Sequence, residues 1–167
     1  MFSVFLRSNA VKTVVFAIAV CSMHGCGRLS TNDKVLKAVH GDPDMEQAIR
    51  QARGTLDTFL AAAAVRAPGT QDFKLKVALQ EGDQTEHFWV TPFNATANGF
   101  EGTLAGDPAV LKSLKSGQRV HFTKDDVADW GYRKDGHQIG SYTMCAAFKT
   151  MSKADVEFYR RNSGYDC

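Results

Sequence analysis

Apolar and polar residues alternate most clearly in two segments, residues 73–79 and 85–91. Alternation of this kind is typical of strands in a sheet that exposes one face to solvent. The intervening segment, residues 81–84, contains Gly and Asp and is typical of a turn. The pattern therefore predicts a β-hairpin in the middle of the chain.

The second strand of this hairpin carries both apolar and ionisable side chains. Because successive side chains point to opposite faces of a strand, two sets are predicted. One face carries Glu86, Phe88 and Val90, and the other carries His87, Trp89 and Thr91. Pro92 cannot donate a hydrogen bond to a neighbouring strand, so the strand is expected to end there or to lie on an edge.

A helical period of apolar residues precedes the hairpin. Asp42 can accept the free N–H groups of a first helical turn, and Pro43 suits the first helical position. The apolar stripe consists of Met45, Ile49, Ala52, Leu56, Phe59, Leu60 and Ala63. This pattern predicts one long helix packed on a sheet, although Gly54 costs about 1 kcal/mol relative to Ala.

Shorter elements complete the predicted fold. Strands are predicted at residues 100–104, 118–122, 130–133 and 138–144, and short helices at residues 107–116 and 152–159. Asp135-Gly136 is a strong signal for a hairpin turn between the last two strands. The sum predicts an α+β fold: a strongly curved, mostly antiparallel sheet or a small partly open barrel, packed by one long N-terminal helix.

The N-terminal segment, residues 1–25, is predicted to be a signal peptide. Arg7 and Lys12 precede an apolar run, residues 13–23, that is too short to span a bilayer. Residues 26–41 are polar and mixed and predict a tether, which leaves residues 42–167 as a single globular domain.

The end of this segment, Met-His-Gly-Cys at residues 23–26, resembles a bacterial lipobox, in which cleavage precedes a cysteine that receives lipid. Gly25 fits that pattern, whereas His24 departs from it. The predicted lipidation site is Cys26. By resemblance to sorting rules in Gram-negative bacteria, Gly27 after the cysteine favours anchoring in the outer membrane, on the periplasmic side of the cell envelope.

Two cysteines remain in the predicted mature domain, Cys145 and Cys167. An even pair in an oxidising compartment predicts a disulfide, and two free thiols are the alternative. Closing a loop of about 20 residues stabilises a protein by roughly 3 kcal/mol in the chain-entropy model.

The charge of the mature chain argues against one class of partner. The whole chain has 20 Lys and Arg and 18 Asp and Glu, and two of the bases, Arg7 and Lys12, leave with the signal peptide. A chain near neutrality has no electrostatic basis for binding nucleic acid. The expected partners are therefore the membrane, through lipid at Cys26, and another protein.

The candidate catalytic chemistry is limited. Glu86 and Asp129 are the carboxylate pair that would act as acid and base in a small hydrolase. The chain contains no nucleophile elbow, no phosphate-binding or dinucleotide-binding glycine pattern, and no metal-ligand spacing. Neither a metal nor another cofactor is predicted.

A binding surface is the competing hypothesis. Four aromatic residues would form a recognition face, and aromatic residues of this kind act as binding hot spots. Together with their ionisable neighbours, the predicted binding residues are Glu86, His87, Trp89, Asp129, Trp130, Tyr132 and Tyr142. In the structural alternative, Asp129 caps a turn and Trp130 packs against the long helix.

An ordered set of short motifs resembles a known family. The set comprises Met45-Glu46-Gln47-Ala48-Ile49, Phe73-Lys74-Leu75-Lys76-Val77, Glu86-His87-Phe88-Trp89-Val90, Gly102-Thr103-Leu104, Asp107-Pro108, Asp129-Trp130, Asp135-Gly136 and Gly140-Ser141-Tyr142-Thr143. Over residues 43–148 the chain resembles the YegJ-like family, a bacterial domain of unknown function that often occurs in small exported lipoproteins. Gly106 and Gly131 depart from the family pattern. The resemblance implies a fold and a cellular location, and it supplies no catalytic residue.

Two functions follow as hypotheses. The first is a non-enzymatic protein-binding module of the immunity or envelope accessory type, suggested by small size, a tether, neutral charge and aromatic residues. The second is a small envelope hydrolase that uses Glu86 and Asp129.

Overall fold

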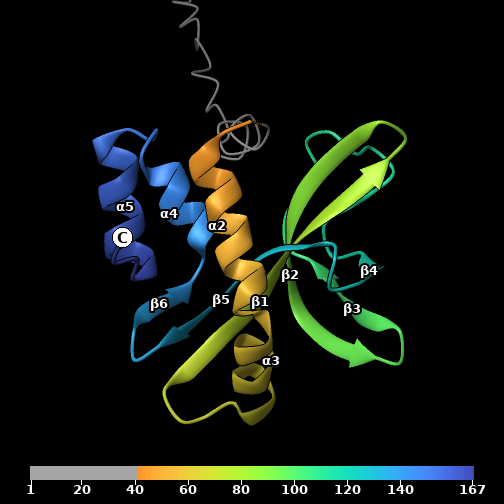
Figure 1. Cartoon of the computed structure of the whole chain (residues 1–167), viewed down its shortest axis with the longest axis horizontal. Helices are drawn as coiled ribbons and strands as arrows, with labels where there is room; N and C mark the ends of the chain where they lie inside the picture. Colours follow the sequence, from red (N-terminus) through yellow and green to blue (C-terminus); the bar gives the residue numbers. More distant parts are fainter. Residues whose placement is uncertain (1–40) are drawn as a thin grey trace, which may run out of the picture.

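Figure 1 shows the computed structural model, which describes residues 41–167. The predicted signal peptide and the lipidation site lie outside the described residues. The helices are α2 (Pro43–Gly54), α3 (Leu56–Val65), α4 (Tyr142–Phe148) and α5 (Lys153–Ser163). The strands are β1 (Thr70–Glu81), β2 (Gln84–Thr96), β3 (Gly99–Leu104), β4 (Arg119–Phe122), β5 (Val127–Lys134) and β6 (His137–Gly140).

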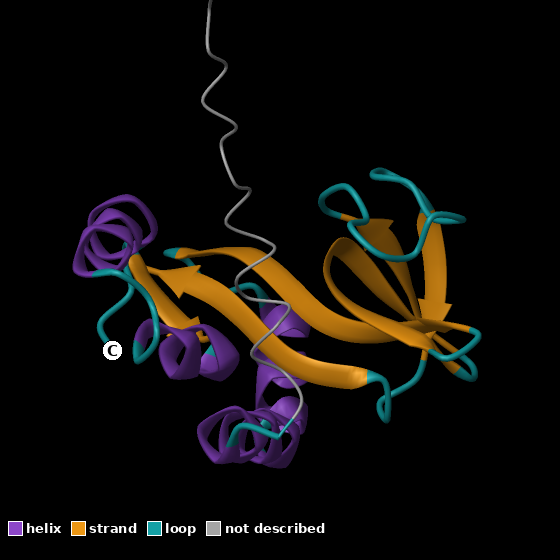
Figure 2. Ribbon diagram, turned by 90° about the horizontal axis from the view of Figure 1, so that it is seen from above, coloured by secondary structure: helices purple, strands orange, loops and turns teal. Residues whose placement is uncertain are grey.

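The six strands form one antiparallel sheet in the order β4-β3-β2-β1-β5-β6. The sheet is strongly twisted, so that β3 and β4 turn away from β5 and β6 (Figures 1 and 2). The two edge strands, β4 and β6, do not pair with each other in residues 41–167. The predicted α+β class is therefore confirmed, whereas the barrel alternative is wrong.

The prediction of one long N-terminal helix is also wrong, because the helix breaks at Thr55. The indole Nε1 of Trp130 donates to the carbonyl oxygen of Ala52 at 2.9 Å, and the Thr55 hydroxyl donates to the carbonyl oxygen of Gln51 at 2.8 Å. In an unbroken helix the Ala52 carbonyl would accept from the N–H of Leu56. The side chains of Trp130 and Thr55 thus replace helical hydrogen bonds next to Gly54.

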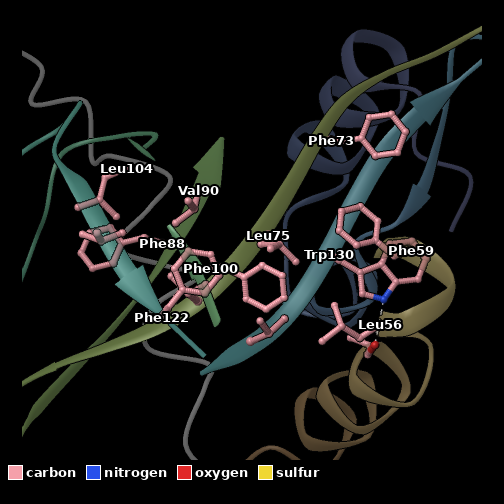
Figure 3. Close-up of a cluster of buried hydrophobic side chains, with 14 of the residues drawn as sticks. Leu56, Phe59, Phe73, Leu75, Phe88, Val90, Phe100, Leu104, Phe122 and Trp130 are labelled. Atoms are coloured by element: carbon pink, nitrogen blue, oxygen red, sulfur yellow. Dashed lines mark hydrogen bonds between the residues drawn. The ribbon is translucent and has the colours of Figure 1, made fainter. Parts of the chain in front are cut away.

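The hydrophobic core lies between α2 and α3 and one face of the sheet (Figure 3). Phe59 stacks on Trp130 with 5.0 Å between ring centroids. Leu75, opposite Trp130, and Val90, opposite Leu75, have no exposed surface. Phe88 and Val90 belong to this core, which confirms the predicted inward face of the second hairpin strand.

Pro92 does not end its strand, contrary to the prediction, because β2 continues to Thr96. The pairing of β2 with β3 shifts between Val90 and Phe93. This irregularity places the residue without an N–H where the regular ladder is interrupted, so Pro92 is tolerated inside the sheet.

Two short predicted elements differ from the structure. Residues 105–118 form turns rather than a helix, and the chain returns to β3 through a hydrogen bond from the N–H of Gly117 to the carbonyl oxygen of Leu104. The predicted strand 138–144 ends at Gly140, because Ser141 adopts a left-handed conformation, φ 57°, and α4 follows. None of the helices in residues 41–167 is long and apolar enough to cross a membrane.

Candidate functional site

A recess of about 310 Å³ lies on the face of the sheet opposite α2 and α3. Its floor includes Lys74 and Lys76 of β1 and Trp89 of β2, and Tyr159 and Tyr165 form part of its wall. We call this recess the lysine–tryptophan pocket. Figure 2 shows α5 on this side of the sheet, with α2 and α3 on the other side.

The position of these side chains follows from strand alternation. Lys76 lies opposite Trp89 on one side of β1 and opposite Asp129 on the other. Directly opposite residues share a face, so Lys74, Lys76, Trp89 and Asp129 point away from the core formed by Leu75 and its neighbours.

Lys76 is a deeply buried cation of the pocket, with 7% of its surface exposed. Its Nζ donates to Thr143 Oγ1 at 3.1 Å, and Thr143 Oγ1 donates to Asp129 Oδ2 at 2.6 Å. Burial lowers the pKa of Lys76 below its usual 10.5, and the carboxylate of Asp129 acts in the opposite direction. A hydroxyl thus links a buried cation to a buried carboxylate.

Asp129 has no exposed surface, and both of its carboxylate oxygens accept hydrogen bonds. Oδ1 accepts the N–H groups of Trp130 and Tyr142, and Oδ2 accepts the N–H and hydroxyl of Thr143. Burial raises the pKa of Asp129, and these hydrogen bonds oppose that effect. Because no oxygen of Asp129 acts as a donor here, the arrangement suits an ionised carboxylate that caps the N-terminus of α4.

The ammonium groups of both lysines lie close to the indole ring of Trp89. The Nζ of Lys74 lies 4.7 Å from the ring centroid and the Nζ of Lys76 lies 5.9 Å from it. Both distances are within the range of cation–π attraction. Burial also lowers the pKa of Lys74, while Asp72 and Asp129 oppose that effect.

The C-terminal segment completes the wall of the pocket. Tyr165 is buried, its side chain is hydrogen-bonded to Ser141, and the carbonyl oxygen of Gly164 accepts the N–H of Gln138 at 2.8 Å. The predicted disulfide between Cys145 and Cys167 is confirmed, with 5.5 Å between the two Cα atoms. It fixes the end of this segment to α4.

Glu86 lines the pocket together with His87 and Trp89, but its carboxylate is directed to the other side of the sheet. It faces the core side of the sheet with 3% exposure, and its carboxylate accepts the N–H groups of Ala109, Val110 and Leu111 at 2.7–2.9 Å. Glu86 and Asp129 therefore point to opposite faces of the sheet, since Glu86 pairs with Leu79 and Asp129 pairs with Lys76. They do not flank a common substrate position, which contradicts their pairing as acid and base.

The predicted aromatic recognition face is not assembled. Trp130 is 4% exposed and packs in the core, and Tyr132 stacks on Phe73 with 4.7 Å between centroids. Tyr142 packs edge-on against Trp130. Of the four aromatics, Trp89 lines the pocket, with the adjacent His87 beside it. The predicted packing of Trp130 against the helical segment matches the geometry, whereas Asp129 caps the N-terminus of helix α4 rather than a turn.

Lys74, Lys76, Tyr159 and Tyr165 are missing from the residues predicted from the sequence. The available signal was the pair of lysines inside an otherwise apolar central strand, where a buried lysine requires a partner. The contribution of Tyr159 and Tyr165 depends on how the C-terminal segment folds back, which no local pattern encodes.

A larger hollow of about 760 Å³ lies between α3 and the turn that joins β2 to β3. Its charged lining residues, Arg66 and Lys124, are both exposed. Residues 41–167 contain no group of three His, Cys, Asp or Glu side chains arranged to hold a metal ion. The lysine–tryptophan pocket is therefore the better candidate site, because a buried charge gives it specific chemistry.

Comparison with known proteins gives a family and no activity. The model of a family described as "Uncharacterized protein conserved in bacteria (DUF2314)" matches residues 42–167. The uncharacterised protein YegJ of Escherichia coli strain K12 is 24% identical over 150 residues, which cover 90% of this chain and 97% of that protein.

A second relative shares only a part of its length with this chain. The putative ankyrin repeat protein NMB1133/NMB1171 of Neisseria meningitidis serogroup B is 25% identical over 103 residues, which are 62% of this chain and 38% of that protein. The chain thus spans well under half of this relative. No solved structure matches the chain at a significant level.

Proposed function

The chain belongs to the DUF2314 family of uncharacterised proteins conserved in bacteria, and we propose that it is an exported, lipid-anchored module that binds another protein at the lysine–tryptophan pocket. Its role would be of the immunity or envelope accessory type rather than catalytic. The proposed location is the periplasmic side of the cell envelope, at the outer membrane, with lipid on Cys26.

One observation carries the proposal. A tryptophan and two partly desolvated lysines line a recess on the side of the sheet away from α2 and α3. Trp is among the residues most enriched at interface hot spots, and such residues act in desolvated pockets. Export and anchoring are supported by the signal-like segment 1–25 and by the lipobox-like residues 23–26.

The geometry does not support the hydrolase alternative, which needs two carboxylates on one side of the sheet. Glu86 and Asp129 face opposite sides of the sheet, and each carboxylate is engaged by backbone N–H groups. Substituting either residue is therefore expected to disturb the fold, so a loss of activity would not identify a catalytic role.

The test is capture of a partner by a soluble form that lacks residues 1–25 and carries Cys26→Ser, from envelope and secreted extracts. A stoichiometric partner should bind this form, and the purified partner should bind the Trp89→Ala variant about thirtyfold more weakly, since a hot-spot truncation costs about 2 kcal/mol or more. Val65→Ala is the matched control, because Val65 is an apolar side chain, 75% exposed, on α3 on the other side of the sheet.

Equal loss of binding in the Trp89→Ala and Val65→Ala variants would contradict the proposed site. Recovery of no stoichiometric partner by the folded, disulfide-bonded form would contradict the proposed function. Circular dichroism and thiol labelling would establish that each variant is folded and oxidised.

A further inference from the structure

The charges around the lysine–tryptophan pocket do not cancel. The ammonium groups of Lys74 and Lys76 lie over one face of the sheet, and Asp129 is the buried carboxylate behind them. Asp72, the other acid near Lys74, is paired with Arg133. Glu86 also lines the recess, but its carboxylate accepts three backbone N–H groups on the core side of the sheet. The two ammonium groups therefore face the buried carboxylate of Asp129, which balances one of their two positive charges.

Within residues 41–167, Lys76 also has unused hydrogen-bonding capacity. An ammonium group carries three N–H donors, and the hydrogen bond to Thr143 uses one of them. Lys74 and Lys76 are two residues apart on one strand, so their ammonium groups reach toward the same recess from the same face. Two ammonium groups that line one recess can each donate to an oxygen of the same carboxylate.

The remaining lining selects among anions. Trp89, Met144, Tyr159 and Tyr165 surround the lysines with largely apolar and aromatic surface. Such surface solvates a doubly charged phosphate poorly, whereas a single carboxylate would balance the one excess positive charge. Asp107 also lines the recess, but it is exposed, so solvent screens its repulsion.

We propose that the lysine–tryptophan pocket binds a carboxylate group of the partner polypeptide, held by the ammonium groups of Lys74 and Lys76 and packed against the indole of Trp89. The inference rests on the proposed function, because it gives the chemistry by which the partner is recognised. The carboxylate belongs to an acidic side chain or to the C-terminus of the partner, and both sources present the same group.

The test uses the full chain in mild detergent and three short peptides as probes. Acetyl-Gly-Asp-Gly-amide offers a side-chain carboxylate, acetyl-Gly-Ala-Gly with a free C-terminus offers a terminal carboxylate, and acetyl-Gly-Asn-Gly-amide offers neither. Proton–nitrogen NMR spectra would follow the indole N–H of Trp89 and the ammonium group of Lys76 during titration.

At least one carboxylate peptide should shift both signals saturably, and the Asn peptide should not. Lys76→Met should weaken binding roughly ten- to hundredfold, since a hydrogen bond to a charged group contributes about 1.5–3 kcal/mol. Lys115→Met, at an exposed lysine outside the pocket, should bind as the parent does. Whichever carboxylate peptide binds more tightly identifies the source.

Three outcomes would overturn the inference: no saturable shift with either carboxylate peptide, equal shifts with the Asn peptide, or saturable binding of inorganic phosphate alone. The failure of the inference is separable from failure of the proposed function. If a captured partner depends on Trp89 but not on Lys76, the proposed binding function stands and the carboxylate inference fails. If the carboxylate peptides bind but no partner is captured, the pocket binds carboxylates and the proposed function fails.

Discussion

At the scale of single residues, Asp129 joins three parts of the fold. It lies on β5, caps α4 through the N–H groups of Tyr142 and Thr143, and lies near Lys76 through the Thr143 hydroxyl. A capping carboxylate usually comes from the helix itself. Here the cap comes from 13 and 14 positions earlier in the chain, so α4 depends on the sheet for its start.

Asp129→Asn should lower the free energy of unfolding by about 3 kcal/mol, because the amide nitrogen cannot accept the hydrogen bonds that one carboxylate oxygen accepts. Urea unfolding followed by circular dichroism measures the change. The matched control is Asp83→Asn in the exposed turn between β1 and β2, which should stay within about 0.5 kcal/mol of the parent. A similar effect of both substitutions would contradict the capping role.

Lys76 should make stability depend on pH in the alkaline range. Its folded-state pKa is lowered by burial below the usual 10.5, so the unfolded chain binds more protons between these two values. The free energy of unfolding therefore rises as pH increases through the folded pKa toward about 10.5, and the cost of burying the charge is fully present at lower pH.

Lys76→Met should reduce this rise when urea unfolding is compared between about pH 7 and pH 9.5, below the range in which tyrosines ionise. Some rise should remain, because burial also lowers the pKa of Lys74. Lys115→Met should leave the rise unchanged. An undiminished rise in the Lys76→Met variant would show that the pH dependence has another source.

Trp89 and Trp130 show what single residues could and could not reveal. Both are tryptophans in predicted strands and both belong to the candidate recognition face, with packing against the long helix as the alternative for Trp130. Trp130 pairs with Leu75 on the core face, whereas Trp89 pairs with Lys76 on the other. The distinction depends on register across three strands, which local sequence does not encode.

At the scale of elements, the central hairpin was predictable because its alternation extends over both strands. The α+β class followed from it. The helix predicted after Asp107-Pro108 failed because the carboxylate of Glu86 binds the N–H groups of Ala109, Val110 and Leu111 while the chain turns back to β3. The missed helix α4 has β-prone residues, Tyr142 and Thr143, at its start, and a distant carboxylate outweighs that preference.

The disulfide should matter most for α5. This helix has no buried side chain, so little apolar surface holds it to the body of the protein. The double variant Cys145→Ser, Cys167→Ser should lose about 3 kcal/mol of unfolding free energy, the value expected for a closed loop of this size.

Amide hydrogen exchange measures where that loss falls. Exchange in α5 should accelerate more than exchange in β1, which lies in the middle of the sheet. Reduction of the parent protein should reproduce the pattern. Uniform acceleration across α5 and β1 would show that the disulfide stabilises the fold as a whole rather than this helix.

At the scale of the whole molecule, the two faces of the sheet differ in what they contact. One face packs α2 and α3 into the core, and the other bears the lysine–tryptophan pocket with α5 at its side (Figure 2). The sequence indicated the first face through apolar periodicity. It did not indicate the second, because Lys74, Trp89 and Tyr165 converge from three separate segments.

The proposed lipid anchor makes a prediction for the whole chain. Mass spectrometry of the protein from the outer-membrane fraction should find an acylated N-terminus beginning at Cys26. Cys26→Ser should abolish the added lipid mass and the membrane fractionation, whereas Cys21→Ser, within the predicted signal peptide, should leave both intact. Retention of the Cys26→Ser variant in the membrane without lipid would contradict the predicted anchor.

The wall formed by Tyr165 has a thermodynamic consequence. Because Cys167 fixes this segment to α4, oxidation of the thiols and occupancy of the pocket belong to one closed cycle of equilibria. If oxidation tightens ligand binding by some factor, then bound ligand must protect the disulfide from reductant by the same factor. Under the proposed export, such coupling would leave the reduced chain with a weak hold on the proposed partner and would make the site competent after oxidation.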